Sequence, residues 1–410
     1  PRARRRGDRL SRERRALGAL VLLVLAAAWV LAAWSLWQTR VPDGLRLPEL
    51  ETDSLFPPTE LERAESYARF LRLDFLASQL VLLVVLALYA WRGARFTRES
   101  AAGRIGTGML LGMIGLALVW LSQVPFRLAE TWWDRRYDQT DAGYLETLFA
   151  NWFALGAEFL FICLALLIVM ALAGRWQRRW WIAAAPFFVG LVALFSFIAP
   201  YLSPTESADA ALRADNRRFA DAQGTEPPRI SVEDVSEFTD APNAYAAGFG
   251  PTRRVVLWST LLDGRFSDGE VELVLAHEVA HHSRNHILEG LAWYALFALP
   301  GAWLIAVATR RRGGMRSPTA VPLSLFVLVG LQLASSPLQN AISRHMEQEA
   351  DWVALQTTSD PGSAQELFKK FTTLALSDPD PPAWSEQLLG SHPSVLERIE
   401  FAEAWRSRSR

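Results

Sequence analysis

The stretch that decides how this chain folds and works is residues 277–286, with the sequence HEVAHHSRNH. His277 and His281 are four positions apart, so on a helix they share one face and can bind one metal ion. Glu278 is turned by about 100° from His277, which lets it reach a metal-bound water without binding the ion. This arrangement is typical of zinc hydrolases. An apolar stretch of membrane length begins at residue 287, which places the motif at a bilayer surface.

Composition favours an integral membrane protein. Of the 410 residues, 51% are hydrophobic, and they include 17 Trp and 22 Phe. The formal net charge of -1 gives no electrostatic basis for nucleic-acid binding, so we expect no nucleic-acid partner. The one cysteine, Cys163, cannot form an internal disulfide. Basic residues are almost all Arg, which suggests a bacterial source and therefore a bacterial plasma membrane.

Apolar stretches predict about seven transmembrane helices. A span needs about 20 residues, and seven stretches approach or exceed that length: 16–37, 74–92, 105–124, 148–173, 180–202, 287–308 and 319–337. The first follows a tail, residues 1–15, that holds eight arginines. It is longer than the apolar core of about 7–15 residues of a signal peptide, so we interpret it as a retained anchor.

The predicted fold is mainly α: a polytopic membrane protein with a metalloprotease domain that contains a small β-sheet. Its expected parts are a basic tail (1–15), transmembrane helices one to five (16–202), the metalloprotease domain (203–286), transmembrane helices six and seven (287–337) and a C-terminal helical part that completes the metal site (338–410).

Local signals divide the polar insertion between the fifth and sixth spans. Residues 208–223 predict an amphipathic helix, and 229–232 and 254–258 predict short strands. Ser267 predicts the start of the motif helix, with Glu270 as its capping partner. The same pattern allows that helix to continue unbroken into the sixth span. A second capping box is expected at Thr59, before the second span.

A third metal ligand is predicted just after the seventh span. Glu347 and Asp351 are four apart, so on a helix Glu347 can complete a His-His-Glu site while Asp351 accepts a hydrogen bond from a ligand histidine. Glu349 and His345 are rival ligands by residue type. Glu349 is rotated by roughly 200° from Glu347, so both cannot face the metal.

Two other histidines of the motif have simpler interpretations. His286 is nine residues after His277, one short of the spacing of a third histidine ligand of the metzincin kind. A polar role at the end of the helix is the expectation for it. His282 points about 100° away from the metal face, so we expect no metal contact there.

Together these motifs resemble the membrane zinc proteases that include the type I CAAX prenyl proteases and the heat-shock membrane protease. The resemblance rests on HExxH followed two spans later by Ser343-Arg-x-x-Glu347-x-x-Ala-Asp351. It extends to residues 243–248, followed by Arg254-Val-Val-Leu257, and to His392-Pro393 followed by Arg398-Ile399. It covers residues 198–400 closely and the earlier part only in layout.

The resemblance implies a gluzincin-type site. It puts His277, His281 and Glu347 on one Zn²⁺ per chain and makes Glu278 the catalytic base and acid. It implies that Asp351 orients a ligand histidine with support from Arg398. The same resemblance gives His392 a catalytic role beside the substrate carbonyl. It implies that the strand residues Asn243, Ala244 and Tyr245 bind the substrate. It also implies spans that enclose a water-filled chamber.

The expected activity is hydrolysis of an extended peptide or protein substrate, possibly membrane-associated, in contact with the lipid bilayer. Cleavage of prenylated proteins and quality control of unprenylated membrane proteins are both open, as is a non-catalytic metal-binding scaffold or chaperone. A transporter would need paired broken spans, which the sequence does not show. Oligomeric state is not predicted.

The side of the membrane that the site faces is ambiguous. Arginine-rich segments place the N-terminus in the cytoplasm, and seven spans would then put the metalloprotease domain outside. The resembling family has its site in the cytosol. We expect a cytoplasm-facing site.

Overall fold

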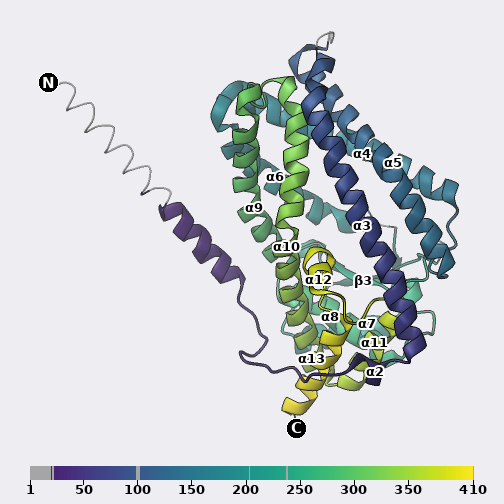
Figure 1. The fold of residues 1–410 in the computed structure, drawn as a ribbon. Coiled ribbons are helices and arrows are strands. Elements are labelled where there is room, and N and C mark those ends of the chain that lie inside the picture. The colour runs from purple at the N-terminus through teal and green to yellow at the C-terminus, as the bar shows by residue number, and fades with distance from the viewer. Residues whose placement is uncertain (1–19, 21–22, 98–101, 203, 237–238, 410) are drawn as a thin grey trace.

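The computed structural model describes residue 20 and residues 23–97, 102–202, 204–236 and 239–409. Long helices dominate these residues and lie side by side in one bundle (Figure 1). They are α3 (Pro58–Arg92), α4 (Gly103–Arg136), α5 (Tyr144–Trp176), α6 (Trp180–Ile198), α9 (His286–Thr309) and α10 (Val321–Thr358). A mainly α fold with a small sheet, as predicted, is confirmed.

Within the described residues, five helical segments are long and apolar enough to cross a membrane. One of them, Leu155–Tyr201, contains the later part of α5 and all of α6, joined by the short 3-10 turn Gln177–Arg179. Six of the seven predicted spans thus lie in described helices. The basic tail and part of the first span lie outside the described residues, and Leu23–Leu36 is a shorter apolar helix. The number seven and the chamber stay predictions.

Small residues set the close packing of α4 in the bundle. A Cβ added at Gly112 would collide with the Leu166 side chain of α5, and one added at Gly108 would collide with Met170. Because a bilayer gives no hydrophobic drive between helices, close approach at small residues supplies the contact. The buried side chains around them include Leu86, Leu111 and Met170.

The polar insertion folds into a sheet with helices at one end of the bundle. It contains β1 (Glu206–Ser207), α7 (Ala210–Ala222), β2 (Arg229–Glu233), β3 (Ala244–Ala247), β4 (Arg254–Trp258) and α8 (Asp268–Ser283). The strand order is β1-β2-β4-β3, with β2 and β4 parallel and the outer pairs antiparallel. β3 is therefore an edge strand, with one side free of a neighbouring strand.

Helices from the C-terminal part complete this end of the molecule. They are α11 (Pro361–Thr373), α12 (Ala383–Leu389) and α13 (Val395–Ser409), next to the short α2 (Thr52–Leu55). One core joins α2, α11 and α13 to α7, β4, α8 and α10, with Phe219, Leu257, Leu275, Leu355 and Ile399 all at most 2% exposed. Each such side chain contributes about 1.5–3 kcal/mol by burial. This core fixes α8 against α10.

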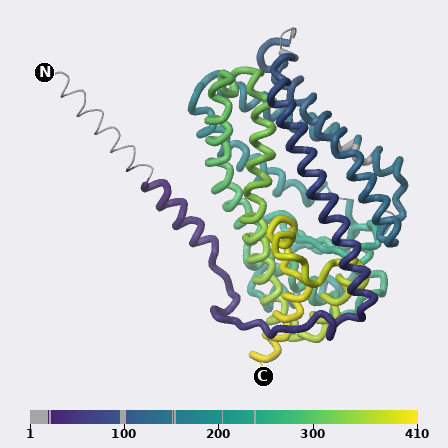
Figure 2. The backbone as a smooth tube through the Cα atoms, in the orientation of Figure 1, coloured from purple at the N-terminus to yellow at the C-terminus, as the bar shows by residue number. Residues whose placement is uncertain are grey.

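The N-terminal strap, residues 37–50, runs across the same end of the molecule. Figure 2 shows this purple segment passing the yellow C-terminal helices on its way to α2. The backbone N–H of Leu50 donates to Glu400 Oε1 at 2.9 Å, and Val41, Leu45 and Leu47 pack against the core. The first apolar helix is thereby connected to the end of the molecule that contains the sheet.

Short 3-10 segments connect the longer elements. They are η1 (Gly93–Thr97), η2 (Gln177–Arg179), η3 (Ala199–Tyr201), η4 (Gly250–Thr252), η5 (Ser259–Leu261), η6 (Arg310–Arg312) and η7 (Pro318–Ala320).

Two predictions about helix ends are wrong. The motif helix does not run unbroken into the sixth span: α8 ends at Ser283, and Asn285 adopts a left-handed backbone with φ of 61° before α9 begins. Asn tolerates that conformation better than most residues. The capping box at Thr59 is also absent, because α3 already begins at Pro58, which suits the first turn of a helix.

Candidate metal centre and active site

The helix α8 is fixed at its start by the predicted cap. Ser267 and Glu270 form a reciprocal capping box, and Lys370 of α11 contacts the buried Glu270 carboxylate at 2.7 Å. A defined start sets the rotation of the whole helix, so the faces that carry His277 and His281 are fixed as well. Both histidines point toward α10.

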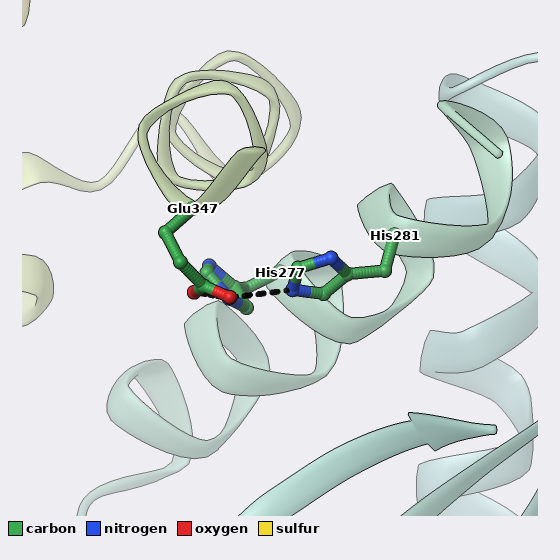
Figure 3. Close-up of side chains that lie close together, drawn as sticks. All are labelled: His277, His281 and Glu347. Carbon is green, nitrogen blue, oxygen red and sulfur yellow. Dashed lines mark hydrogen bonds and ion pairs between the residues drawn. The ribbon is translucent and has the colours of Figure 1, made fainter. Parts of the chain in front are cut away.

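His277, His281 and Glu347 form a cluster that could hold a metal ion. Each offers one ligand atom, and these atoms lie within 4.8 Å of one another. His277 Nε2 lies 3.1 Å from Glu347 Oε2 and 3.1 Å from His281 Nε2. Figure 3 shows the three side chains meeting, Glu347 from one helix and both histidines from the other. Two imidazoles and a carboxylate are a donor set that zinc accepts, with a fourth position left for water or substrate.

Asp351 and Arg398 hold the first histidine from behind. His277 Nδ1 lies 2.9 Å from Asp351 Oδ1, and Arg398 donates to both Asp351 oxygens, at 2.8 and 2.7 Å. The structure therefore brings together the residues predicted for this support. Burial alone would lower the pKa of His277, but hydrogen bonds to Asp351 and Glu347 outweigh it and raise that pKa to about 10. A field that retains a proton there also favours a metal cation in its place.

Glu278 lies beside this cluster in a groove. The groove is lined by residues from α8, the β3 edge and the C-terminal part, among them Asn243, Ala244, His277, Glu278, His392 and Arg398. Burial is the main cause that raises the pKa of Glu278 to about 7, while a hydrogen bond from the Ala246 backbone opposes it. A carboxylate in this position can exchange protons with a molecule in the groove.

The predicted substrate strand lies at the free edge of the sheet. The Asn243 side chain accepts a hydrogen bond from the Ala244 N–H at 2.9 Å, and its carbonyl accepts one from Trp258 at 3.0 Å. Ala244 lines the groove. The Tyr245 hydroxyl instead donates to Glu233 at 3.0 Å, so its ring is held by the sheet. Asn243 and Ala244 thus line the groove, and Tyr245 is not among the residues that line it.

His392 enters the groove from the loop before α13. Its Nε2 lies 3.3 Å from Glu347 Oε2, and its side chain is 57% exposed. It is the most open of the imidazoles near the cluster, since the side chains of His277 and His281 are 10% and 15% exposed. An exposed imidazole beside the open side of the metal ligands can contact a bound substrate.

The rival ligands take other places. His345 stacks on Trp37 of the N-terminal strap, with ring centroids 4.3 Å apart. His282 lies 3.0 Å from the Arg254 carbonyl, which it contacts through Nε2. Glu349 pairs with Arg284 at 2.8 Å and with His286 at 3.2 Å. The contacts of Glu349 and His286 were not predicted, because they depend on the turn at Asn285.

Comparison with known proteins agrees with this geometry. Residues 206–406 match the family described as Peptidase family M48. This part of the chain belongs to that family. The matched region contains the three candidate ligands, Glu278 and the supporting pair Asp351 and Arg398.

Relatives of this chain include bacterial and eukaryotic proteins. The "Uncharacterized metalloprotease YhfN" of Bacillus subtilis is 30% identical over 256 residues, which are 58% of this chain and 60% of that protein. A "CAAX prenyl protease 1 homolog" of Oryza sativa is 27% identical over half of each chain. A "Protease HtpX homolog" of Acidiphilium cryptum is 26% identical, over 57% of this chain and 91% of its own. The chain spans 60% and 50% of the length of the first two.

The fold extends beyond the matched region. The crystal structure of Ste24p from S. mikatae superposes with a TM-score of 0.69 at 18% identity, covering 92% of this chain and 97% of that one. The chain therefore shares this fold over 92% of its length. Its five described helical segments that are long and apolar enough to cross a membrane indicate an integral membrane protein.

Proposed function

We propose that this protein is a zinc-dependent integral-membrane metalloendopeptidase. The observation that carries the proposal is the cluster of His277, His281 and Glu347, with Glu278 beside it in a groove that borders a free strand edge. Zinc suits the donor set. A scaffold that keeps a metal only for stability does not require a buried acid such as Glu278 in the groove beside the metal cluster.

Each residue of the site has a separate role in the proposed hydrolysis. When bound, zinc lowers the pKa of a water and polarises the carbonyl of the scissile peptide. Glu278 accepts a proton from the attacking water and delivers it to the leaving amine as the C–N bond breaks. His392 contacts the substrate carbonyl from the open side. Asp351 and Arg398 keep His277 in one orientation.

An extended peptide is the substrate that the groove suits. A segment placed along the outer edge of β3 pairs backbone to backbone with the strand, beginning at Asn243 and Ala244. Such pairing is independent of sequence and requires a substrate without its own secondary structure. The groove also has an apolar side, formed by Leu261, Leu273, Val274, Leu367, Phe368 and Phe371. It would hold an apolar side chain of the substrate.

The test is chelator-sensitive cleavage by the purified full-length chain in nanodiscs. Zinc content is measured first. A farnesylated peptide, the same peptide without its lipid and an unfolded protein are then compared as substrates. Faster cleavage of the farnesylated peptide identifies a prenyl-protein protease, and equal rates identify a general membrane protease. A chain that binds zinc and cleaves none of the three contradicts the proposed activity.

Substitution of the acid provides the sharpest control. Glu278→Gln should retain zinc and lose cleavage, because an amide cannot take the proton. Glu272→Gln makes the same chemical change on the same helix, where Glu272 contacts Arg218 at 2.9 Å away from the groove. It should cleave normally. Cleavage by Glu278→Gln at the Glu272→Gln rate would contradict the role of Glu278.

A further inference from the structure

A buried chain of polar contacts leads away from the second histidine ligand. His281 Nδ1 lies 2.9 Å from His286 Nδ1, and His286 Nε2 lies 3.2 Å from Glu349 Oε2. Glu349 Oε1 accepts from Arg284 Nε and from the backbone N–H of Arg40, both at 2.8 Å. His286 and Glu349 are 4% and 3% exposed. Buried polar groups of this kind are retained only with their partners satisfied.

With both imidazoles neutral, one set of hydrogen positions satisfies every contact in this chain. His281 Nε2 lies in the metal cluster, so a neutral His281 carries its hydrogen on Nδ1 and donates it to His286 Nδ1. His286, then an acceptor at Nδ1, carries its own hydrogen on Nε2 and donates to Glu349. Glu349 has its other oxygen filled by two donors. The tautomer that leaves His281 Nε2 free for a metal is the one this arrangement selects.

The break between α8 and α9 makes the contact possible. On a continuous helix, five residues turn by about 140° beyond a full turn, so His286 would face away from His281. The left-handed Asn285, with φ of 61°, reverses this and brings His286 back beside His281. The strained turn and the buried carboxylate thus serve the same contact.

We infer that His286 and Glu349 are positioning residues that fix the tautomer and ring orientation of the metal ligand His281. The inference rests on the proposed metal site. Metal-binding histidines commonly donate their second ring N–H to a neighbour that is held in place, and loss of that neighbour lowers metal affinity. Here the neighbour is an imidazole, and Glu349 holds it.

Glu349→Gln tests the inference with almost no change of shape. An amide cannot accept from all three donors: either its NH₂ faces His286 Nε2, or it faces Arg284 and the Arg40 N–H. In the first case His286 must accept at Nε2, so it carries its hydrogen on Nδ1, where it faces the Nδ1 hydrogen of His281. In the second case the NH₂ group faces Arg284 and the Arg40 N–H, which are also donors, so neither hydrogen bond can form. Zinc affinity should fall by about 10–100-fold, and the visible absorption of the Co²⁺-substituted protein should change because His281 is displaced.

Glu400→Gln is the matched control. Glu400 also accepts a backbone N–H of the N-terminal strap, from Leu50 at 2.9 Å, but is absent from the chain of contacts to His281. It should bind zinc like the original protein and keep the Co²⁺ spectrum. Thermal unfolding of the metal-free forms shows whether either variant changes the fold.

A second variant decides the case if Glu349→Gln does not fold. His286→Asn keeps an oxygen that can accept from His281 Nδ1 but cannot reach Glu349, so its affinity should lie between those of the original protein and His286→Leu. Zinc affinity within twofold of the original in a folded Glu349→Gln or His286→Leu protein, with an unchanged Co²⁺ spectrum, overturns the inference. Absence of zinc binding by the original protein would instead overturn the proposed function.

Discussion

The two histidines of the proposed metal site differ in the residues that hold them. His277 contacts a carboxylate directly, since Asp351 lies 2.9 Å from its Nδ1. His281 contacts another imidazole, and the carboxylate of Glu349 is one residue further away. The pKa values follow this difference: contacts with Asp351 and Glu347 outweigh burial and raise that of His277 to about 10, whereas burial lowers that of His281 to about 3.

The contacts of His277 mainly supply negative charge, whereas the contacts of His281 mainly fix the orientation of its ring. Asp351 gives His277 a negative neighbour that strengthens its attraction for a cation, and Arg398 keeps that carboxylate ionised. The His286 side fixes only direction and tautomer. A site with a carboxylate directly behind each histidine would be more negatively charged. Both imidazoles would then have raised pKa values, and a proton would compete with the metal at each of them. The asymmetric arrangement limits that competition to one ligand.

The largest effect is expected where the two sides meet. Glu347 lies 3.1 Å from His277 and 3.6 Å from His281, so it is shared by both. Glu347→Gln should lose stoichiometric zinc and all measurable cleavage, a greater loss than the about 10–100-fold expected for residues behind the ligands. Metal analysis of the purified protein measures this. Full zinc occupancy after dialysis would remove Glu347 from the ligand set.

Removing charge on the His277 side should cost more than on the His281 side. Asp351→Asn leaves Arg398, only 12% exposed, without its anion. Breaking a buried pair in this way costs about 3–5 kcal/mol, in addition to about 10–100-fold in zinc affinity.

The measurements for this comparison are thermal unfolding of the metal-free protein and zinc competition with a chelator. Glu349→Gln is the reference, because Arg284 is more exposed, at 28%, than Arg398. Equal destabilisation by Asp351→Asn and Glu349→Gln would show that the two sides do not differ in charge.

The arginines allow a finer comparison. Arg398 donates two hydrogen bonds to Asp351 and lies over the Phe368 ring at 4.2 Å, whereas Arg284 donates one to Glu349. Lys cannot reproduce a planar two-bond contact. Loss of one charge-assisted bond, about 1.5–3 kcal/mol, should lower zinc affinity about tenfold or more in Arg398→Lys. Arg284→Lys should change it less, and chelator competition measures both. The reverse order would contradict the asymmetry.

The His277 side could be predicted from sequence because local geometry decides it. A four-residue spacing places His277 with His281, and Glu347 with Asp351, on one face each whatever the helices contact. Ser267 and Glu270 mark the start of α8 in the same local way. Spacing within one helix does not show which other helix its face contacts. The expectation that these two helices meet came from the resemblance to a known family.

The His281 side was not predicted, for a physical reason. Its contacts join three segments, represented by Arg40, His286 and Glu349, that are far apart in the chain. They also require a turn at Asn285 inside a stretch whose residues favour a continuous helix. Asn was the one local signal, because it tolerates a left-handed backbone. A single such residue does not decide between a break and an unbroken helix.

The smallest effect concerns the N-terminal strap, which reaches the His281 side only. The donor to Glu349 is the backbone N–H of Arg40, and the residue is exposed. Arg40→Ala keeps that N–H and should leave zinc affinity unchanged. Arg40→Pro removes it, and Glu349 keeps Arg284 and His286 as donors, so the loss should be only a few-fold.

Zinc competition on both Arg40 variants and thermal unfolding of their metal-free forms check this expectation. An equal loss in Arg40→Ala and Arg40→Pro would show that the strap acts through the arginine side chain. A loss in Arg40→Pro alone would connect the first apolar helix of the chain to the metal through a single amide.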